Sequence, residues 1–179
     1  LMQKELKTGG YIAIGEIGID LYWSKEFLKE QEAAFRTQIE WAKKHQLPIV
    51  IHCREAFEEI LHILDEMNDD KLSGIFHCFT GSLEQAKHIL SYGNFKLGIG
   101  GILTYKNAGL DKVVAQLSLK DLVLETDAPY LAPVPFRGKR NESQYITHVA
   151  ERLSEIFQTN MEKVAEISSS NALKIFTLP

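Results

Sequence analysis

Four apolar stretches of this sequence each lead into a residue that can bind a metal ion. In chain order, these residues are Glu16, His52, His77 and, just beyond Glu125, Asp127. A buried strand that ends in such a residue presents it at its carboxyl end, where folds of alternating strands and helices place their chemistry. Imidazole nitrogen and carboxylate oxygen suit zinc, manganese and, with more oxygen, magnesium. A lone histidine after a strand is usually a packing residue, but four ligand-type residues at matching positions favour a metal site.

The apolar stretches also predict the secondary structure. Five strands are expected, over residues 11–17, 47–51, 73–77, 95–99 and 122–125. Amphipathic stretches predict helices over residues 24–45, 55–67, 82–92 and 108–117, and two further helices after residue 141, the last ending near Phe176. The expected helix-capping residues are Ser24, Ser82 with Gln85, and Thr159 with Glu162. This alternation of strands and helices indicates an α/β fold with a parallel sheet covered by helices.

Two α/β architectures fit this order of elements, an open doubly wound sheet and part of a (β/α)₈ barrel of the TIM type. An open sheet binds its ligand at one switch point between two strands, whereas a ring of strands brings every strand end to one centre. Four strands ending in ligand-type residues therefore favour the barrel. A full barrel takes about 250 residues and eight strands. We expect residues 1–179 to be a single domain, the C-terminal two-thirds of a metallo-hydrolase barrel that starts in mid-helix, with about three strands missing.

Composition limits the classes of function. Hydrophobic residues make up 45% and charged residues 25% of the chain, as in a soluble globular protein, and the apolar stretches fall short of the roughly 18 residues that a membrane helix needs. The formal charge of −4 gives no overall attraction for nucleic acid, so a polyanionic substrate would need metal ions or a local basic patch. Cys53 and Cys78 are interpreted as reduced packing residues that point away from the site, which indicates a cytoplasmic location.

The carboxylates Glu125 and Asp127 have two possible roles. They are the acid and base of a glycosidase, or one of them is a metal ligand and the other supports a ligand. Two histidines at neighbouring strand ends favour the second role. The remaining histidines fall in predicted helices among charged residues and are expected to be exposed; they are His45, His62, His88 and His148.

Basic and aromatic residues near the predicted site are candidates for substrate binding. Arg137 and Lys139 belong to a basic cluster at 137–140, which is either a solvated loop or a phosphate clamp. Arg54 either reaches an anion or pairs with an acid such as Glu55. Phe79 and Tyr130 either stack on bases or pack in the core. In each case both alternatives remain open at this stage.

Taken in order, these motifs resemble the TatD family of metal-dependent deoxyribonucleases, which belongs to the amidohydrolase-like barrels. The matching segments are 15–20 (GEIGID), 52–55 (HCRE), 77–81 (HCFTG), 125–131 (ETDAPYL) and 137–142 (RGKRNE). The resemblance implies a (β/α)₈ barrel and up to two divalent ions, Mg, Mn or Zn. It also implies that Glu16 bridges the ions, that His52 and His77 hold one of them, and that Asp127 holds the other.

The sequence departs from the family pattern in two places. The family begins with a His-x-His pair on its first strand, whereas the segment before Glu16 contains no histidine. On this basis the chain is expected to match strands four to eight of the barrel, either as a fragment of a longer gene product or as a naturally truncated chain. The missing segment or a second copy is then expected to close the barrel. Ser143 stands where the family usually has proline, which affects only the start of a helix.

The expected activity is metal-dependent phosphodiester hydrolysis of DNA without sequence specificity. Asp127 and Glu16 are the expected catalytic residues, and Arg54, Arg137 and Lys139 the expected substrate-binding residues. Two rival interpretations are kept. One is an amidohydrolase-type reaction on a substrate other than nucleic acid, which a neutral or acidic pocket would favour. The other is a non-catalytic scaffold, which failure to bind metal would favour.

Overall fold

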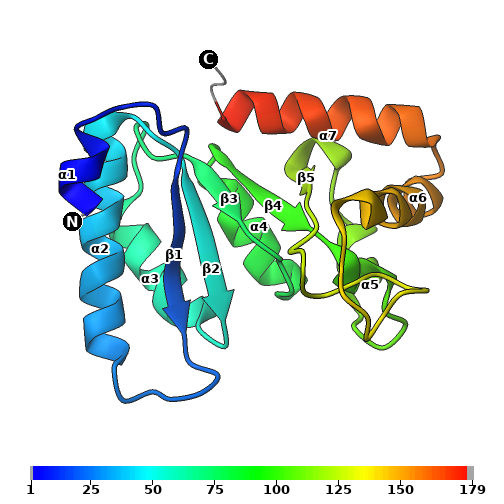
Figure 1. Cartoon of the computed structure of the whole chain (residues 1–179), viewed down its shortest axis with the longest axis horizontal. Coiled ribbons are helices and arrows are strands. Elements are labelled where there is room, and N and C mark those ends of the chain that lie inside the picture. The colour runs from blue at the N-terminus through cyan, green and yellow to red at the C-terminus, as the bar shows by residue number, and fades with distance from the viewer. Residues whose placement is uncertain (1, 177–179) are drawn as a thin grey trace.

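The computed structural model describes residues 2–176, which form five strands and seven α-helices (Figure 1). The strands are β1 (Ile14–Asp20), β2 (Ile49–Arg54), β3 (Gly74–Phe76), β4 (Phe95–Ile99) and β5 (Leu122–Leu124). The helices are α1 (Met2–Leu6), α2 (Leu28–His45), α3 (Phe57–Met67), α4 (Leu83–Ser91), α5 (Leu110–Val114), α6 (Ile146–Ile156) and α7 (Met161–Ile175). Short 3₁₀ segments cover Gly101–Thr104, Leu119–Asp121 and Ser143–Tyr145. Within the described residues, no helix combines the length and apolar character needed to cross a bilayer.

The strands lie side by side in chain order, β1-β2-β3-β4-β5, and every neighbouring pair is parallel. A doubly wound sheet reverses its strand order at a switch point, and this sheet does not. The predicted α/β class with a parallel sheet is therefore confirmed, and the doubly wound alternative is wrong for these strands. Without a reversal, the carboxyl ends of β1 to β5 all lie along one continuous edge.

Alternation along the strands separates two faces of the sheet. Ile49 and Ile51 of β2 are fully buried in the main core, together with Phe35 of α2 and Leu64 of α3. Helices α2, α3 and α4 cover this face (Figure 1). Burying one such side chain completely contributes about 1.5–3 kcal/mol, so this layer supplies much of the stability of the sheet.

The opposite face of the sheet carries a smaller apolar cluster and the polar strand ends. Ile75 of β3 and Val123 of β5 contact Ile175 of α7 there. Asn171 of α7 is 2% exposed, and its amide nitrogen donates to the carbonyl oxygen of Leu122 at 2.7 Å. This hydrogen bond fixes α7 against the beginning of β5.

Two strands extend further than the sequence predicts. β1 continues to Asp20 and β2 to Arg54, so His52 lies inside its strand rather than after it. The extension arises because Gly18 pairs with His52 and the ladder continues to Asp20 and Arg54. β1 also carries one extra residue relative to β2 between Ile14 and Ile17. Such a bulge redirects the side chains beside it, and Glu16 lies within it.

Several predicted helix boundaries were wrong. The helix α2 begins at Leu28, so Ser24 does not cap it, although its hydroxyl accepts a hydrogen bond from the Glu26 backbone. Asn160 rather than Thr159 caps α7, because its side chain accepts from the Lys163 backbone and asparagine is the stronger capping residue. α5 is shorter than residues 108–117 and ends at Val114. The capping box of Ser82 and Gln85 on α4 is confirmed.

Candidate metal centre

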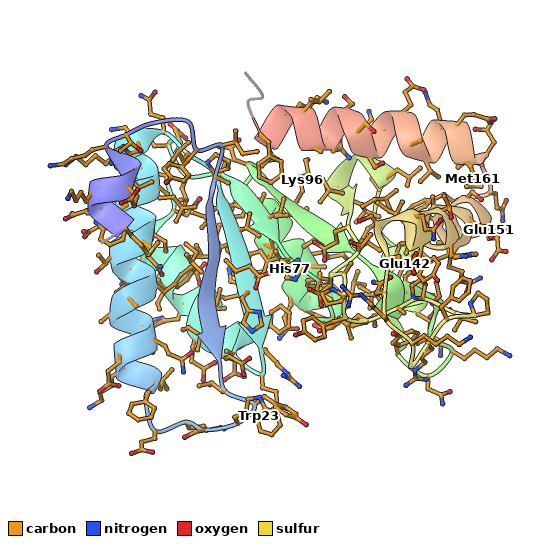
Figure 2. The ribbon with its side chains drawn as sticks, in the orientation of Figure 1. Trp23, His77, Lys96, Glu142, Glu151 and Met161 are labelled. Carbon is orange, nitrogen blue, oxygen red and sulfur yellow. The ribbon has the colours of Figure 1, made fainter. Side chains whose placement is uncertain are left out.

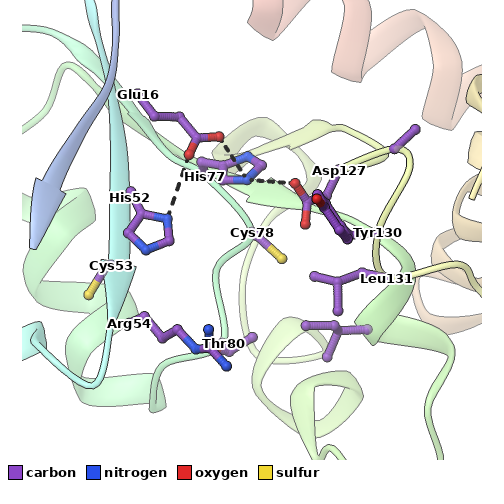
Figure 3. A pocket seen from close by; sticks show the side chains of 12 residues that line it. Glu16, His52, Cys53, Arg54, His77, Cys78, Thr80, Asp127, Tyr130 and Leu131 are labelled. Carbon is purple, nitrogen blue, oxygen red and sulfur yellow. Dashed lines mark ion pairs between the residues drawn. The ribbon is translucent and has the colours of Figure 1, made fainter. Parts of the chain in front are cut away.

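The four predicted metal ligands line one cavity of about 710 Å³ at the carboxyl ends of the strands (Figure 3). Glu16 reaches it from β1 and His52 from β2, whereas His77 and Asp127 follow the last residues of β3 and β5. Parallel strands in consecutive order bring their carboxyl ends to the same edge. The ends of the strands therefore bring together residues that lie far apart in the sequence.

Glu16 lies between the two histidines, with one carboxylate oxygen directed to each. Its Oε1 is 3.3 Å from His77 Nε2, and its Oε2 is 3.6 Å from His52 Nδ1. Asp127 Oδ1 is also 3.3 Å from His77 Nε2 (Figure 3). Glu16, His77 and Asp127 each offer a donor atom within 4.8 Å of the other two. The structure thus groups three of the four predicted ligands, and His52 contacts the second oxygen of Glu16.

A second carboxylate holds each histidine from the other side of its ring. Asp20 Oδ2 lies 3.0 Å from His52 Nε2, and Glu125 Oε2 lies 2.9 Å from His77 Nδ1. Histidine ligands of metals typically engage a carboxylate in this way, which fixes the ring and its tautomer. The ring nitrogens that remain, His52 Nδ1 and His77 Nε2, both face Glu16. Glu125 therefore supports a histidine, and Asp127 belongs to the donor group.

The site is rich in negative charge and draws protons to His77. The hydrogen bond to Glu125, helped by the charges of Glu125, Glu16 and Asp127, raises the pKa of His77 to about 9, although burial opposes this. Burial also works against the charged form of Asp20, but hydrogen bonds from the Tyr22 backbone and from His52 lower the pKa of that carboxyl. Carboxylates arranged around imidazole nitrogens form an environment that suits a divalent cation. A cation at His77 Nε2 would take the place of the proton.

The comparison with protein families matches residues 1–177 to the family described as TatD related DNase. The chain belongs to the TatD family. It is 44% identical over 168 residues to the uncharacterized metal-dependent hydrolase YabD of Bacillus subtilis, covering 93% of this chain and 66% of that protein. It is 34% identical over 168 residues to the uncharacterized metal-dependent hydrolase YcfH of Escherichia coli K12, covering 93% of this chain and 63% of that protein. The chain therefore spans about two thirds of the length of these curated relatives.

Solved structures of the TatD family share the fold. The crystal structure of YjjV, a TatD homolog from Escherichia coli, superposes with a TM-score of 0.90 at 29% identity, covering 99% of this chain and 68% of that one. The family match begins at residue 1, so it does not confirm the expectation that this chain lacks the family's first strand. The likeness to YjjV supports the TIM-barrel-like class.

The predicted substrate-binding residues of this TatD-family chain lie in different places. Arg54 lines the cavity, and its guanidinium lies 3.6 Å above the centre of the Tyr22 ring. Within residues 2–176, no carboxylate oxygen lies within ion-pair distance of Arg54, although its charge helps to lower the pKa of Asp20. Arg137 stacks on the Tyr105 ring at 4.4 Å, and both Arg137 and Lys139 are exposed. Neither of these two is among the described residues that line the cavity. Arg54 is thus the predicted substrate-binding residue that the structure brings to the metal centre.

The aromatic and cysteine predictions have mixed outcomes. Phe79 is 2% exposed in the core and cannot stack on a base, whereas Tyr130 is 68% exposed and lines the cavity. Both cysteines are free thiols, and burial raises the pKa of each to about 12, which keeps them unreactive. The prediction that they point away from the site holds for Cys53, which packs against the main core on the face covered by helices. It was wrong for Cys78, which lines the cavity beside Glu125, Glu16 and Asp127. For Cys78 the alternation rule fails because β3 ends at Phe76.

Two residues of the site, Asp20 and Asn141, were not predicted from the sequence. Asp20 was missed because β1 was expected to end at residue 17; its spacing of four from Glu16 on one strand was the available signal. Asn141 is 3% exposed, and its amide nitrogen donates to the carbonyl oxygens of Thr126 and Tyr130. These bonds tie the end of the long loop to the segment that carries Asp127. No local sequence pattern indicates that Asn141 holds the loop in this way.

The backbone conformation at two residues and a glycine on β4 allow the side chains of the site to take their positions. Cys78 and Asp127 have φ values of 45° and 54°, in the left-handed region that few residues other than glycine adopt. Both follow the last strand residue closely, where the chain turns to present a side chain to the cavity. Gly98 of β4 lies against Glu125, and a Cβ added there would overlap Glu125 Oε2. Glu125 can therefore reach His77 only because residue 98 is a glycine and has no side chain.

Replacing Gly98 with alanine is expected to weaken binding of Mn²⁺ at least tenfold, because the new methyl group displaces Glu125 from His77. Isothermal titration calorimetry measures the change. Gly100→Ala is the matched control, since a Cβ there would meet the Glu125 carbonyl oxygen at an ordinary contact distance of 3.5 Å. Equal Mn²⁺ affinities for the two variants would contradict the role assigned to Gly98.

Proposed function

We propose that this chain carries the metal centre of a divalent-metal-dependent hydrolase that cleaves phosphodiester bonds in DNA, as an exonuclease. The observation that carries the proposal is the arrangement around Glu16, with His52 and His77 presenting one ring nitrogen each to it and a carboxylate holding the other nitrogen of each ring. Membership of the family described as TatD related DNase supports the choice of substrate.

The residues present fit a divalent cation. Glu16, His77 and Asp127 supply carboxylate oxygen and imidazole nitrogen within 4.8 Å of one another, a donor set that suits Mn²⁺ or Zn²⁺ and, with further oxygen ligands, Mg²⁺. These three would hold one ion, and His52 with the second oxygen of Glu16 offers the start of a second site. A divalent ion bound there supplies a Lewis acid that polarises the phosphodiester and lowers the pKa of bound water.

The chain's own side chains account for the remaining steps. Asp127 directs Oδ1 to His77, which leaves Oδ2 to accept the proton of the attacking water. Glu16 and Glu125 hold His77 from both sides and keep its ring in place. Arg54 at the cavity wall binds a phosphate oxygen of the substrate. Since carboxylates surround the centre, an anionic substrate depends on a bound cation to enter it.

The proposal also includes the predictions about the complete barrel, the location of the protein and the need for a further segment. The five strands are proposed to form strands four to eight of a (β/α)₈ barrel, within a single domain over residues 1–179. A cytoplasmic location and a need for a further segment or a second copy stay predictions. The rival amidohydrolase-type reaction keeps one supporting observation: Arg137 and Lys139 lie outside the cavity, and among residues 2–176 Arg54 is the one arginine or lysine that lines it.

The decisive assay is nucleotide release from an end-labelled single-stranded oligonucleotide by the protein as its gene encodes it, with Mg²⁺, Mn²⁺ or EDTA. We expect release with either metal and none with EDTA. Protein that binds Mn²⁺ in calorimetry but releases no nucleotide would exclude the nuclease and favour the amidohydrolase-type reaction. Protein that neither binds Mn²⁺ nor cleaves would favour the scaffold.

A further inference from the structure

An exposed pair of aromatic residues, Tyr22 and Trp23, follows β1 and is linked to the metal centre through Arg54 and Asp20. Trp23 is 83% exposed, more than the other large apolar side chains of residues 2–176, and its neighbour Tyr22 is 47% exposed. Both come shortly after β1, which ends at Asp20, and Figure 2 shows Trp23 beyond the carboxyl end of β1. A tryptophan this exposed contributes little to the core, so its position needs another explanation.

Tyr22 is held by several contacts, and Trp23 packs against it. The Tyr22 and Trp23 rings meet edge to face, with centroids 4.7 Å apart and planes at 88°. The Arg54 guanidinium covers the Tyr22 ring at 3.6 Å, and the Tyr22 backbone donates a hydrogen bond to Asp20 Oδ1 at 3.0 Å. A preorganised aromatic surface loses little freedom when a ligand stacks on it. Tyr22 and Trp23 thus form an aromatic platform in which the exposed indole packs against a ring that Arg54 covers.

The platform connects directly to the metal centre. Asp20 accepts from Tyr22 through one oxygen and contacts His52 Nε2 through the other, at 3.0 Å. Arg54 belongs both to the stack on Tyr22 and to the cavity wall. A phosphate oxygen bound by Arg54 would therefore leave the neighbouring nucleotide beside Tyr22 and Trp23. On the other side of the cavity, Tyr130 is 68% exposed.

We propose that Trp23 stacks on an unpaired base of a single-stranded nucleic acid, the base next to a phosphate held by Arg54. This inference rests on the proposed phosphodiesterase function and adds the form of the substrate. Aromatic side chains beside positive charge bind single strands by stacking, because an unpaired base exposes its whole face. Bases inside a duplex stack on each other and cannot cover the indole. The platform therefore selects single-stranded ends over intact duplex.

The kinetic test compares the protein with its Trp23→Ala variant on a single-stranded oligonucleotide in the presence of Mn²⁺. KM is expected to rise about 5- to 100-fold, more than kcat falls, because stacking on one base is lost. Trp23→Phe should restore most of the affinity. Leu173→Ala, which removes a side chain that is 59% exposed on α7, is the matched control. On an oligonucleotide whose terminal nucleotides are abasic, the protein and Trp23→Ala should have equal KM values.

A binding measurement separates this inference from the proposed function. Trp41 is the second tryptophan of the chain and packs against the core, so a Trp41→Phe background isolates the fluorescence of Trp23. A thymidine oligonucleotide should quench this fluorescence, and the matching duplex should not. Quenching without cleavage would support the platform and overturn the nuclease. Cleavage with unchanged KM in Trp23→Ala would overturn the platform and leave the nuclease, and equal quenching by the duplex would overturn the selection of single strands.

Discussion

Replacing Asp127 with asparagine is expected to lower turnover of a phosphodiester substrate at least a hundredfold while the fold stays intact. Asp127 is one of the three grouped donors, and its Oδ1 lies 3.3 Å from His77 Nε2. Asparagine keeps the shape of the side chain but removes its negative charge and its ability to accept a proton. Positioned acid–base groups commonly contribute a factor of about 10²–10⁴ to the rate. The variant also loses a metal ligand. The loss of the proton acceptor and the loss of the metal ligand both lower the rate.

The measurement is single-turnover cleavage of an end-labelled oligonucleotide at saturating Mn²⁺, with thermal unfolding recorded for each protein. Asp70→Asn makes the same chemical change at an exposed residue beyond the end of α3, before β3 begins, and is expected to be fully active. Equal activity of the Asp127 and Asp70 variants would remove Asp127 from catalysis. A lowered unfolding temperature in the Asp127 variant alone would show instead that the carboxylate contributes to stability.

The order of elements was predictable because buried strands and amphipathic helices leave different periods in the sequence. The stretch at 95–99 is a strand with the predicted bounds, and the Ser82–Gln85 capping box begins α4 as expected. The rule that parallel strands share one edge then predicted where Glu16, His52, His77 and Asp127 meet. These features depend on local pattern and on a general property of parallel sheets.

The remaining features of the site depend on contacts between distant segments. The extension of β1 to Asp20 follows from its pairing with β2, which begins almost thirty residues later in the chain. The support of His77 by Glu125 joins β3 and β5. Arg137 lies on Tyr105 rather than in the cavity, and the course of its loop is fixed where Asn141 binds Thr126 and Tyr130. No local pattern encodes such contacts, so the sequence could indicate that Glu125 or Asp127 supports a ligand, but not which of them does so or that the ligand is His77.

Replacing Glu125 with glutamine is expected to weaken binding of Mn²⁺ about 10- to 100-fold, although Glu125 is not among the grouped metal donors. Both of its oxygens accept hydrogen bonds, Oε2 from His77 Nδ1 at 2.9 Å and Oε1 from the Cys78 backbone N–H. Glutamine has one carbonyl oxygen, so its amide group would face either the imidazole N–H or the backbone N–H. In either case two donors meet, and the His77 ring loses its fixed orientation.

Calorimetric titration with Mn²⁺ measures the effect, and Glu58→Gln, at an exposed residue in the first turn of α3, is the control. Gly98→Ala displaces the same carboxylate by a different route, so the two changes should not be additive. The double variant should bind Mn²⁺ about as weakly as the weaker of the two single variants. Additive losses would mean that Gly98 and Glu125 act on the site separately. Unchanged affinity in Glu125→Gln would mean that Glu16 and Asp127 alone orient His77, because they would then be its only remaining carboxylate contacts in residues 2–176.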